Sequence, residues 1–265
     1  MSARPHSDGS AGDVDYAPLA GGYRSYRRPD PRIESAIAGA LGALGAARTV
    51  LNVGAGAGSY EPVDRMVTAV EPSASMRAQR PAGRAAIDAT AEDLPFDDDS
   101  FDASMATFSV HQWSDVEAGL AEMRRVTRGP VVILSMDPSR VERFWLNDYA
   151  PEVMATEASR YPTIDRVARA LGGEVEVIVM PIPFDCVDGF NQAYYGRPEL
   201  LLDPGARAAN SAWSFVGPEV EERFARHLAT DLESGAWDEK YGSLRHQPEF
   251  DAALRLVVAK PASRA

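Results

Sequence analysis

The chain has 265 residues, of which 45% are hydrophobic and 25% charged, an ordinary globular composition. Its formal net charge of -12 argues against a nucleic acid as partner, because contacts to phosphates need clustered lysine and arginine. A single cysteine, Cys186, excludes an internal disulfide, and no apolar run reaches the about 20 residues that a membrane span needs. The first residues also lack the apolar core of a signal peptide. We therefore expect a cytoplasmic monomer or homodimer with a small-molecule partner, no nucleic acid and no membrane.

The chain begins with a stretch that is poor in large apolar residues. Residues 1–15 are rich in Ser, Gly, Asp and Ala, which predicts a flexible tail. Two tyrosines and several arginines follow, and apolar residues at helical spacing then predict a helix over residues 33–44.

Residues 50–60 read VLNVGAGAGSY, a short apolar run that ends in three alternating glycines. This pattern is typical of a buried strand that turns into a tight loop, because glycine lets the backbone turn and lets a ligand touch it. The dinucleotide-binding fingerprint would need glycine or alanine at Ser59, so a pyrophosphate ligand is disfavoured. Glu71 ends the next strand, predicted at residues 66–70, and its carboxylate suits both hydroxyls of a ribose. The sequence therefore predicts an adenosine ligand without a pyrophosphate.

The rest of the chain alternates strands with helices, which predicts a parallel sheet whose strand carboxyl ends face one crevice. Only about a dozen residues separate the first two strands, so the helix between them has about one turn at most. Ser114 and Glu117 form a capping-box pattern at the start of a helix that Gly129 ends. We predict further strands at residues 84–88, 101–110, 131–135, 174–180 and 251–260, and helices at 139–149, 164–171 and 219–232. The long stretch between the last two strands predicts a helical cap over residues 181–250, inserted into a core of residues 16–180 and 251–261.

Three motifs in order carry a family resemblance: VLNVGAGAGSY, then VTAVEPSASM at residues 67–76, then AEDLPFDDDSFD at residues 91–102. They resemble the S-adenosylmethionine-dependent methyltransferases with the Rossmann-like fold (class I), in particular their small-molecule "type 11" branch. The resemblance covers about a third of the chain. It implies an α/β, doubly wound, mostly parallel seven-stranded sheet with an antiparallel last strand, and S-adenosylmethionine as cofactor. It also implies methyl transfer to an O, N or C atom of a small molecule, and a place in specialised metabolism.

Two positions depart from the family's pattern. Asn52 stands where the family often has an acid, and Thr90 stands where an aspartate is common. The resemblance implies that an arginine of the leading segment, Arg27 or Arg28, meets the carboxylate of the methyl donor; the alternative is that both are solvated or stack on tyrosines. The expected cofactor-binding residues are Gly54, Ala55, Gly56, Gly58, Glu71, Pro72, Met76, Ala91, Glu92, Thr107, Arg27 and Arg28.

His111 is the best candidate for a general base, because its ordinary pKa is near 6.5 and it follows a predicted strand at the crevice. The alternatives are a contact to substrate and a purely structural role. We place the acceptor between the leading segment, residues 144–149 and the insertion, where aromatic residues suit a flat or apolar molecule. The expected substrate contacts are Tyr23, Tyr26, Trp113, Trp145, Tyr149 and Tyr195.

No metal site is expected, since the carboxylates of residues 97–99 are typical of an exposed turn. Two other functions remain open at this point. One is a nicotinamide-dependent oxidoreductase on the same type of sheet; the other is a non-catalytic regulatory protein that binds S-adenosylmethionine.

Overall fold

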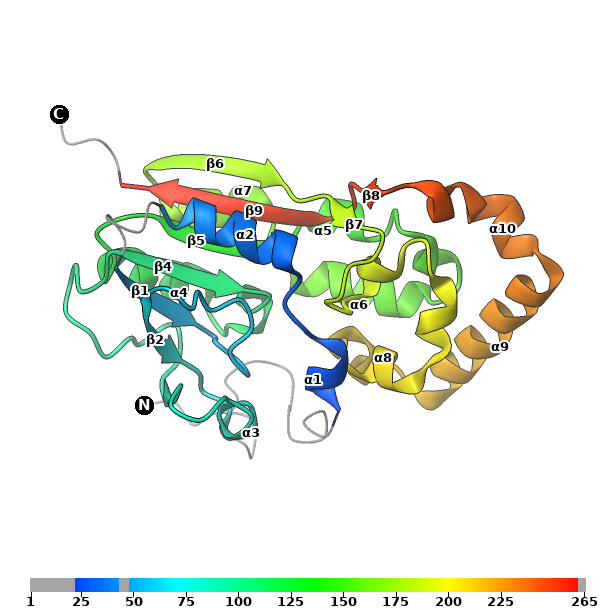
Figure 1. The fold of residues 1–265 in the computed structure, drawn as a ribbon, viewed down its shortest axis with the longest axis horizontal. Coiled ribbons are helices and arrows are strands. Elements are labelled where there is room, and N and C mark those ends of the chain that lie inside the picture. The colour runs from blue at the N-terminus through cyan, green and yellow to red at the C-terminus, as the bar shows by residue number, and fades with distance from the viewer. Residues whose placement is uncertain (1–21, 43–47, 262–265) are drawn as a thin grey trace.

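The computed structural model describes residues 22–42 and 48–261 (Figure 1), so the tail expected at residues 1–15 lies outside the described residues. Seven strands form one sheet in the order β3-β2-β1-β4-β5-β9-β6. Every neighbouring pair is parallel except those of β9, which runs antiparallel to both β5 and β6. The predicted sheet is therefore confirmed. Its strands are β1 (Thr49–Val53), β2 (Met66–Val70), β3 (Ala86–Ile87), β4 (Ala103–Thr107), β5 (Val131–Met136), β6 (Glu174–Val179) and β9 (Leu254–Lys260).

Helices cover both faces of this sheet, because successive side chains of a strand point to opposite sides. Val132 and Leu134 of β5 join the apolar cluster that contains Ile33 and Ile37 of α2 (Pro31–Ala40). Val131 and Ile133 instead join the cluster of α4 (Val116–Arg125) and α7 (Ile164–Leu171). In Figure 1, α2 lies in front of the sheet and the other two helices lie behind it.

Several predicted boundaries differ from the structure. The predicted helix over residues 139–149 is two pieces, α5 (Pro138–Val141) and a 3₁₀ turn η2 (Trp145–Asp148). The predicted strand over residues 101–110 is only β4, and a second 3₁₀ turn, η1 (Val110–Gln112), follows it. The prediction that Ser114 and Glu117 form a capping box is also wrong. The side chain of Asp115 accepts from the backbone amide of Ala118 and caps α4, whereas the Ser114 hydroxyl donates to Glu92.

The first two strands are joined without a helix, as the spacing predicts. The chain passes from β1 through the glycine loop and Pro62 into β2. Tyr60 holds the turn in a left-handed conformation, with φ 63°. A single-turn helix, α3 (Ala74–Ala78), follows β2.

The chain between β6 and β9 forms a lobe beside the sheet, on the right of Figure 1. Near the two ends of this lobe, β7 (Ile182–Pro183) and β8 (Glu249–Phe250) form a short antiparallel pair. Between them lie η3 (Asn191–Tyr194), η4 (Pro198–Leu202), α8 (Pro204–Ala208), η5 (Ser211–Phe215), α9 (Pro218–Ser234), α10 (Ala236–Tyr241) and η6 (Gly242–His246).

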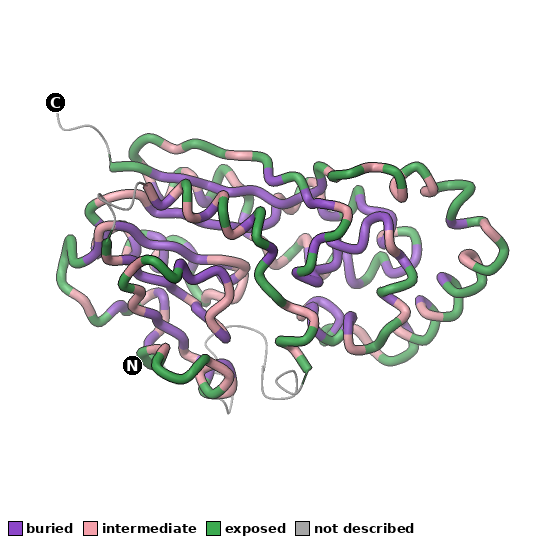
Figure 2. The backbone as a smooth tube through the Cα atoms, in the orientation of Figure 1, coloured by how far each residue is buried: buried purple, intermediate pink, exposed green. Residues whose placement is uncertain are grey.

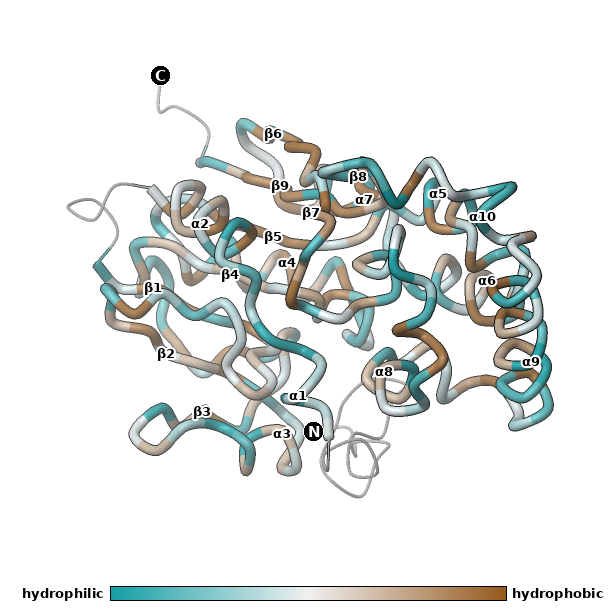
Figure 3. The backbone as a smooth tube through the Cα atoms, turned by 45° about the vertical axis from the view of Figure 1, so that its right-hand side comes forward, coloured by the Kyte–Doolittle hydropathy of each residue, from teal (hydrophilic) through white to brown (hydrophobic). Residues whose placement is uncertain are grey.

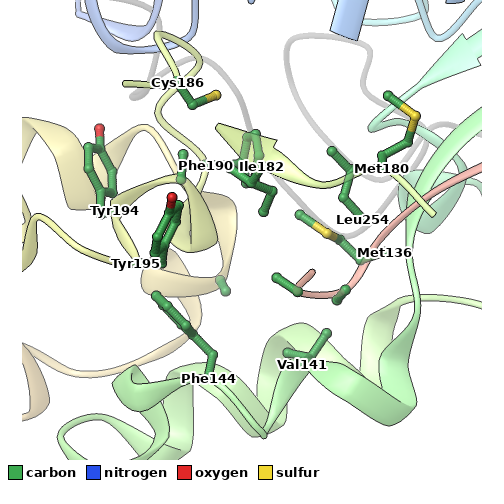
Figure 4. Close-up of a cluster of buried hydrophobic side chains, with 14 of the residues drawn as sticks. Met136, Val141, Phe144, Met180, Ile182, Cys186, Phe190, Tyr194, Tyr195 and Leu254 are labelled. Carbon is green, nitrogen blue, oxygen red and sulfur yellow. The ribbon is translucent and has the colours of Figure 1, made fainter. Parts of the chain in front are cut away.

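Two elements from outside this stretch pack on the lobe. They are α1 (Tyr23–Tyr26) and α6 (Pro151–Arg160), which contact α8 and η5 respectively. One apolar cluster runs from the sheet into the lobe, and Figure 4 shows part of it, from Met136 and Leu254 at strand ends to Tyr195 in the lobe. The lobe therefore shares its core with the sheet.

Burial follows the hydropathy of the sequence. The central strands are almost wholly buried (Figure 2), and hydrophobic residues concentrate in them, whereas α9 alternates between hydrophobic and hydrophilic residues (Figure 3). None of the helices in the described part of the chain is long and apolar enough to cross a membrane.

Candidate active site

The glycine loop leaves β1 at the middle of the sheet, where β1 pairs with both β2 and β4. Gly54, Gly56 and Gly58 have φ of 65°, 52° and 92°, a region that side chains disfavour. A Cβ on Gly54 would also lie 2.6 Å from the Cβ of Ser109. Conformation and space therefore both require glycine at this turn.

Glu71 closes β2 beside this loop. One carboxylate oxygen accepts from the amide of Gly56 at 2.7 Å, and the other accepts from the amide of Ser73 at 2.8 Å. Burial raises the pKa of Glu71, although both amides act in the opposite direction. A carboxylate has about four acceptor positions, so these two bonds leave capacity for a ligand's hydroxyl groups.

A buried ion pair lies behind the loop. Glu61 Oε1 accepts from Arg80 Nη2 at 2.6 Å and from the side-chain Nδ2 of Asn52 at 3.0 Å. The same guanidinium donates to the carbonyl oxygens of Ala55 and Gly56. Glu61 thus places a carboxylate next to Asn52, the position at which the family resemblance leads one to expect an acid.

A first cavity, with about 920 Å³ of empty space that includes the solvent at its mouth, opens over the loop and Glu71. Most of the expected cofactor-binding residues line it, and so do two of the expected substrate contacts. They are Gly54, Ala55, Gly56, Glu71, Pro72, Met76, Ala91, Glu92, Thr107 and Arg27, with Tyr23 and Trp113. Gly58 and Arg28 do not line it, and Arg28 is exposed.

Arg27 joins the leading segment to the lobe. Its Nε donates to Asp188 at 2.6 Å, and its guanidinium lies 5.1 Å from the centre of the Phe108 ring. Tyr60 donates to the same carboxylate at 2.8 Å, and the amide of Gly189 donates to the carbonyl of Tyr26. We call the contacts of residues 23–32 with residues 185–203 the clasp, and three of its residues, Tyr23, Arg27 and Asp188, line the first cavity.

A second, smaller cavity adjoins the first, and both are lined by Tyr23, Arg27 and Phe108. Phe108 has φ 51°, an uncommon conformation for an aromatic residue. Its ring packs 5.3 Å from that of Phe190. The other lining residues are His111, Met136, Glu157, Arg160, Tyr161, Ala209, Asn210, Ser211 and Ala212.

His111 lies in η1 and faces this second cavity. Its ring centre is 4.4 Å from that of Tyr161. Its Nδ1 is buried and has no hydrogen-bond partner within the described residues. Burial lowers the pKa of His111 well below its usual value, and the charges of Arg160 and Arg27 lower it further, so the imidazole is neutral at neutral pH.

The structure places four of the expected substrate contacts outside both cavities. Trp145 Nε1 donates to the carbonyl of Tyr195, whose hydroxyl donates to the carbonyl of Gln247. The hydroxyls of Tyr149 and Tyr26 donate to Asp231 and Asp203. The acceptor site expected beside residues 144–149 therefore stays a prediction, since Trp145, Tyr149 and Tyr26 each donate to a residue of the lobe and none of them lines either cavity.

Sequence reasoning missed Phe108, Gln112, Glu157 and Asp188, which also line the cavities. Both polar ends of the Gln112 side chain are buried without a partner among the described residues. Asp188 is 161 residues from Arg27 in the chain, and no local pattern marks it. Within residues 22–42 and 48–261, no group of three or more His, Cys, Asp or Glu side chains could hold a metal ion.

Residues 51–133 match the family Methyltransf_11, described as a methyltransferase domain. A solved structure from Anabaena variabilis, a candidate methyltransferase from an antibiotic biosynthesis pathway, is 31% identical with a TM-score of 0.81, over 89% of this chain and 99% of that one. No curated protein matches the chain.

Two more distant structures share the fold. Phosphoethanolamine N-methyltransferase 2 of Haemonchus contortus, in complex with S-adenosylmethionine, is 13% identical with a TM-score of 0.55, over 96% of this chain and 61% of that one. The [4+2]-cyclase SpnF is 16% identical with a TM-score of 0.52, over 94% of each chain.

The seven-stranded sheet with one reversed strand and the glycine loop beside Glu71 define a class I methyltransferase that depends on S-adenosylmethionine. Within that class, the chain belongs to the type 11 family. The expected enzyme class and cofactor are thus confirmed, and the oxidoreductase and non-catalytic alternatives are set aside.

Proposed function

We propose that the first cavity binds S-adenosylmethionine and that the second receives a small-molecule acceptor. Glu71 would accept from the ribose hydroxyls, and the loop residues 54–56 would pack against the nucleoside. Pro72, Met76, Ala91, Glu92 and Thr107 would form the remaining walls. Arg27 would meet the methionine carboxylate, since its Nη1 has no hydrogen-bond partner within the described residues.

The observation that carries this proposal is the shared wall of the two cavities, formed by Tyr23, Arg27 and Phe108. S-adenosylmethionine supplies an electrophilic methyl group on a sulfonium. The protein's part is then to hold the acceptor in line with that methyl group and to exclude water. A second cavity that opens beside the first is suited to this task.

His111 is our candidate for the group that accepts the proton or hydrogen bond of the acceptor. It is neutral at neutral pH, and its buried Nδ1 has no partner among the described residues. We further propose that residues 181–250 act as the acceptor-binding cap on a core of residues 16–180 and 251–261, because Asp188, Phe190 and Asn210 line the cavities.

We propose that the acceptor is a small molecule of specialised metabolism and that the enzyme acts in the cytoplasm. The 31% identical relative from Anabaena variabilis is named after an antibiotic biosynthesis pathway, which supports this assignment.

The experiment has a binding part and a product part. Glu71→Ala should weaken S-adenosylmethionine binding about 10- to 100-fold by calorimetry, from the loss of hydrogen bonds to a charged group. The exposed Asp97→Asn is the matched control. Incubation with methyl-labelled S-adenosylmethionine and a metabolite extract then identifies the acceptor. Unchanged affinity in Glu71→Ala contradicts the assignment of the first cavity, and label found only in protein or nucleic acid contradicts a small-molecule acceptor.

A further inference from the structure

Glu157 of α6 is a buried carboxylate on the wall of the second cavity, with 7% of its surface exposed. Its Oε2 accepts from Asn191 Nδ2 at 2.7 Å. Its Oε1 accepts no hydrogen bond from the residues that the structure describes, and none of their cations forms an ion pair with it. Burial raises the pKa of Glu157, while Asn191 and the charges of Arg160 and Arg27 act the other way. This carboxylate therefore has an acceptor position that the described protein leaves unused.

A hydrogen-bond network of the lobe orients this carboxylate. Asn191 Oδ1 accepts from Trp213 Nε1 at 3.0 Å, and the backbone N–H of Asn191 donates to Asn210 Oδ1 at 2.9 Å. Asn210 Nδ2 in turn donates to the carbonyls of Gly189 and Ala206. All these polar groups are buried, and buried polar groups destabilise a fold unless they are hydrogen-bonded. The network thus fixes one oxygen of Glu157 and leaves the other for a ligand.

The other walls of the cavity determine which ligand suits this oxygen. Four aromatic rings, those of Tyr23, Phe108, Tyr161 and Phe190, line the cavity and can face a cation. The two arginines of the wall have contacts of their own. The Arg27 guanidinium is paired with Asp188 at 2.6 Å. The Arg160 guanidinium lies 4.7 Å from the centre of the Phe215 ring and donates to Ser211 Oγ.

We infer, on the basis of the proposed function, that the methyl acceptor is an amine whose N–H donates to Glu157 Oε1. The amine nitrogen forms its bond to the methyl carbon while the carbon–sulfur bond breaks, and the electron pair of that bond stays on sulfur. The nitrogen therefore becomes positively charged and leaves as a methylammonium. A carboxylate beside the nitrogen stabilises the charge that develops there.

An oxygen acceptor is disfavoured by the same electrostatics. A phenolate or carboxylate acceptor would enter with a negative charge next to the carboxylate of Glu157, and like charges at close range repel. His111 fits an amine as well, because it lines the same cavity and its Nδ1, which has no partner among the described residues, can accept a second N–H. Glu157 is thus the residue that selects amine acceptors over phenols and carboxylic acids.

The test uses two panels of molecules of matched size, aromatic and alkyl amines in one, phenols and carboxylic acids in the other. Each is incubated with the enzyme and methyl-labelled S-adenosylmethionine. The inference predicts label in the amine panel alone. Label in the phenol or acid panel, or in neither panel, overturns the inference, whereas a failure of the enzyme to bind S-adenosylmethionine overturns the proposed function instead.

A binding measurement checks the role of Glu157 without turnover. Calorimetry of the best amine with the enzyme saturated by S-adenosylhomocysteine should show at least a tenfold loss of amine affinity in Glu157→Gln. The affinity for S-adenosylmethionine should stay unchanged, which also shows that the variant folds. Glu152→Gln is the matched control, since Glu152 is an exposed acid on the same helix. Equal amine affinity in Glu157→Gln and the native enzyme refutes the assignment.

Discussion

The buried ion pair of Glu61 with Arg80 supports the glycine loop, because the guanidinium donates to the carbonyls of Ala55 and Gly56. Both side chains are almost fully buried, with 1% and 2% of their surface exposed, and their N–O distance is 2.6 Å. Glu61→Leu would leave the guanidinium buried without its carboxylate, which typically destabilises a protein by about 3–5 kcal/mol. At roughly 2–4 °C per kcal/mol for a chain of this size, we expect the melting temperature to fall by about 6–20 °C.

The double variant Glu61→Leu with Arg80→Met separates charge from packing. Replacing both partners of a buried pair by apolar residues is often nearly neutral, so the double variant should recover most of the lost stability. It should still bind S-adenosylmethionine weakly, because methionine cannot donate to the carbonyls of Ala55 and Gly56 as Arg80 does. Denaturant unfolding and calorimetry measure the two effects separately.

A relocation of the charge provides a second check. Asn52→Asp combined with Glu61→Gln moves the carboxylate from residue 61 to residue 52. In the native protein the Nδ2 of Asn52 lies 3.0 Å from the Oε1 of Glu61. This double variant should be more stable than Glu61→Gln alone. The reasoning is refuted if Glu61→Leu is as stable as the double variant with Arg80→Met, since the arginine would then not need its partner.

Three further predictions concern single side chains. Asp188→Asn leaves Arg27, whose side chain is 12% exposed, without its carboxylate and should lower the free energy of unfolding by about 3 kcal/mol. The substitution Asp185→Asn at an exposed ion pair should change it little, and urea unfolding compares the two variants. The pKa of His111 is lowered in the folded state, so the unfolded chain takes up more protons below about pH 6.5 and the native protein loses stability there. In His111→Gln, the unfolding free energy should therefore fall less between pH 7 and pH 5 than it does in the native protein. An equal fall in the two proteins would contradict the assignment of this loss to His111. Gly54→Ala should abolish S-adenosylmethionine binding, because the new Cβ would clash with the Cβ of Ser109 at 2.6 Å. Gly83→Ala, at φ 81° with open space around the Cβ, should only strain the backbone, and calorimetry with S-adenosylmethionine compares the two variants.

The sequence predicts the sheet and the first cavity well because their signals are local. The glycine loop and Glu71 lie within about twenty residues of each other, and strand patterns reflect burial on both faces. The second cavity is different, since it joins the leading segment, η1, α6 and the lobe. On α6, Glu157 has the sequence context of a surface charge, and only the packing of the lobe buries it.

Two differences between the expectations and the structure have a similar physical origin. Ser114 and Asp115 are adjacent, and both side chains can cap a helix, so the pattern alone does not choose between them. Trp145 and Tyr195 are chemically suited to hold a flat ligand, but large aromatic residues also form cores. Here the Trp145 indole donates to the Tyr195 carbonyl, and both side chains are buried in the apolar cluster that the sheet and the lobe share.

The two partners of the clasp, Arg27 and Asp188, are made at different times during synthesis. The two residues are 161 positions apart. At about 5–20 residues per second, Arg27 is made roughly 8–30 s before Asp188. The glycine loop and Glu71 are made within that interval, whereas Asp188, which lines the first cavity, is made only at its end. A nascent chain therefore carries the loop and the acid that we propose bind the methyl donor well before it carries the acid that pairs with Arg27.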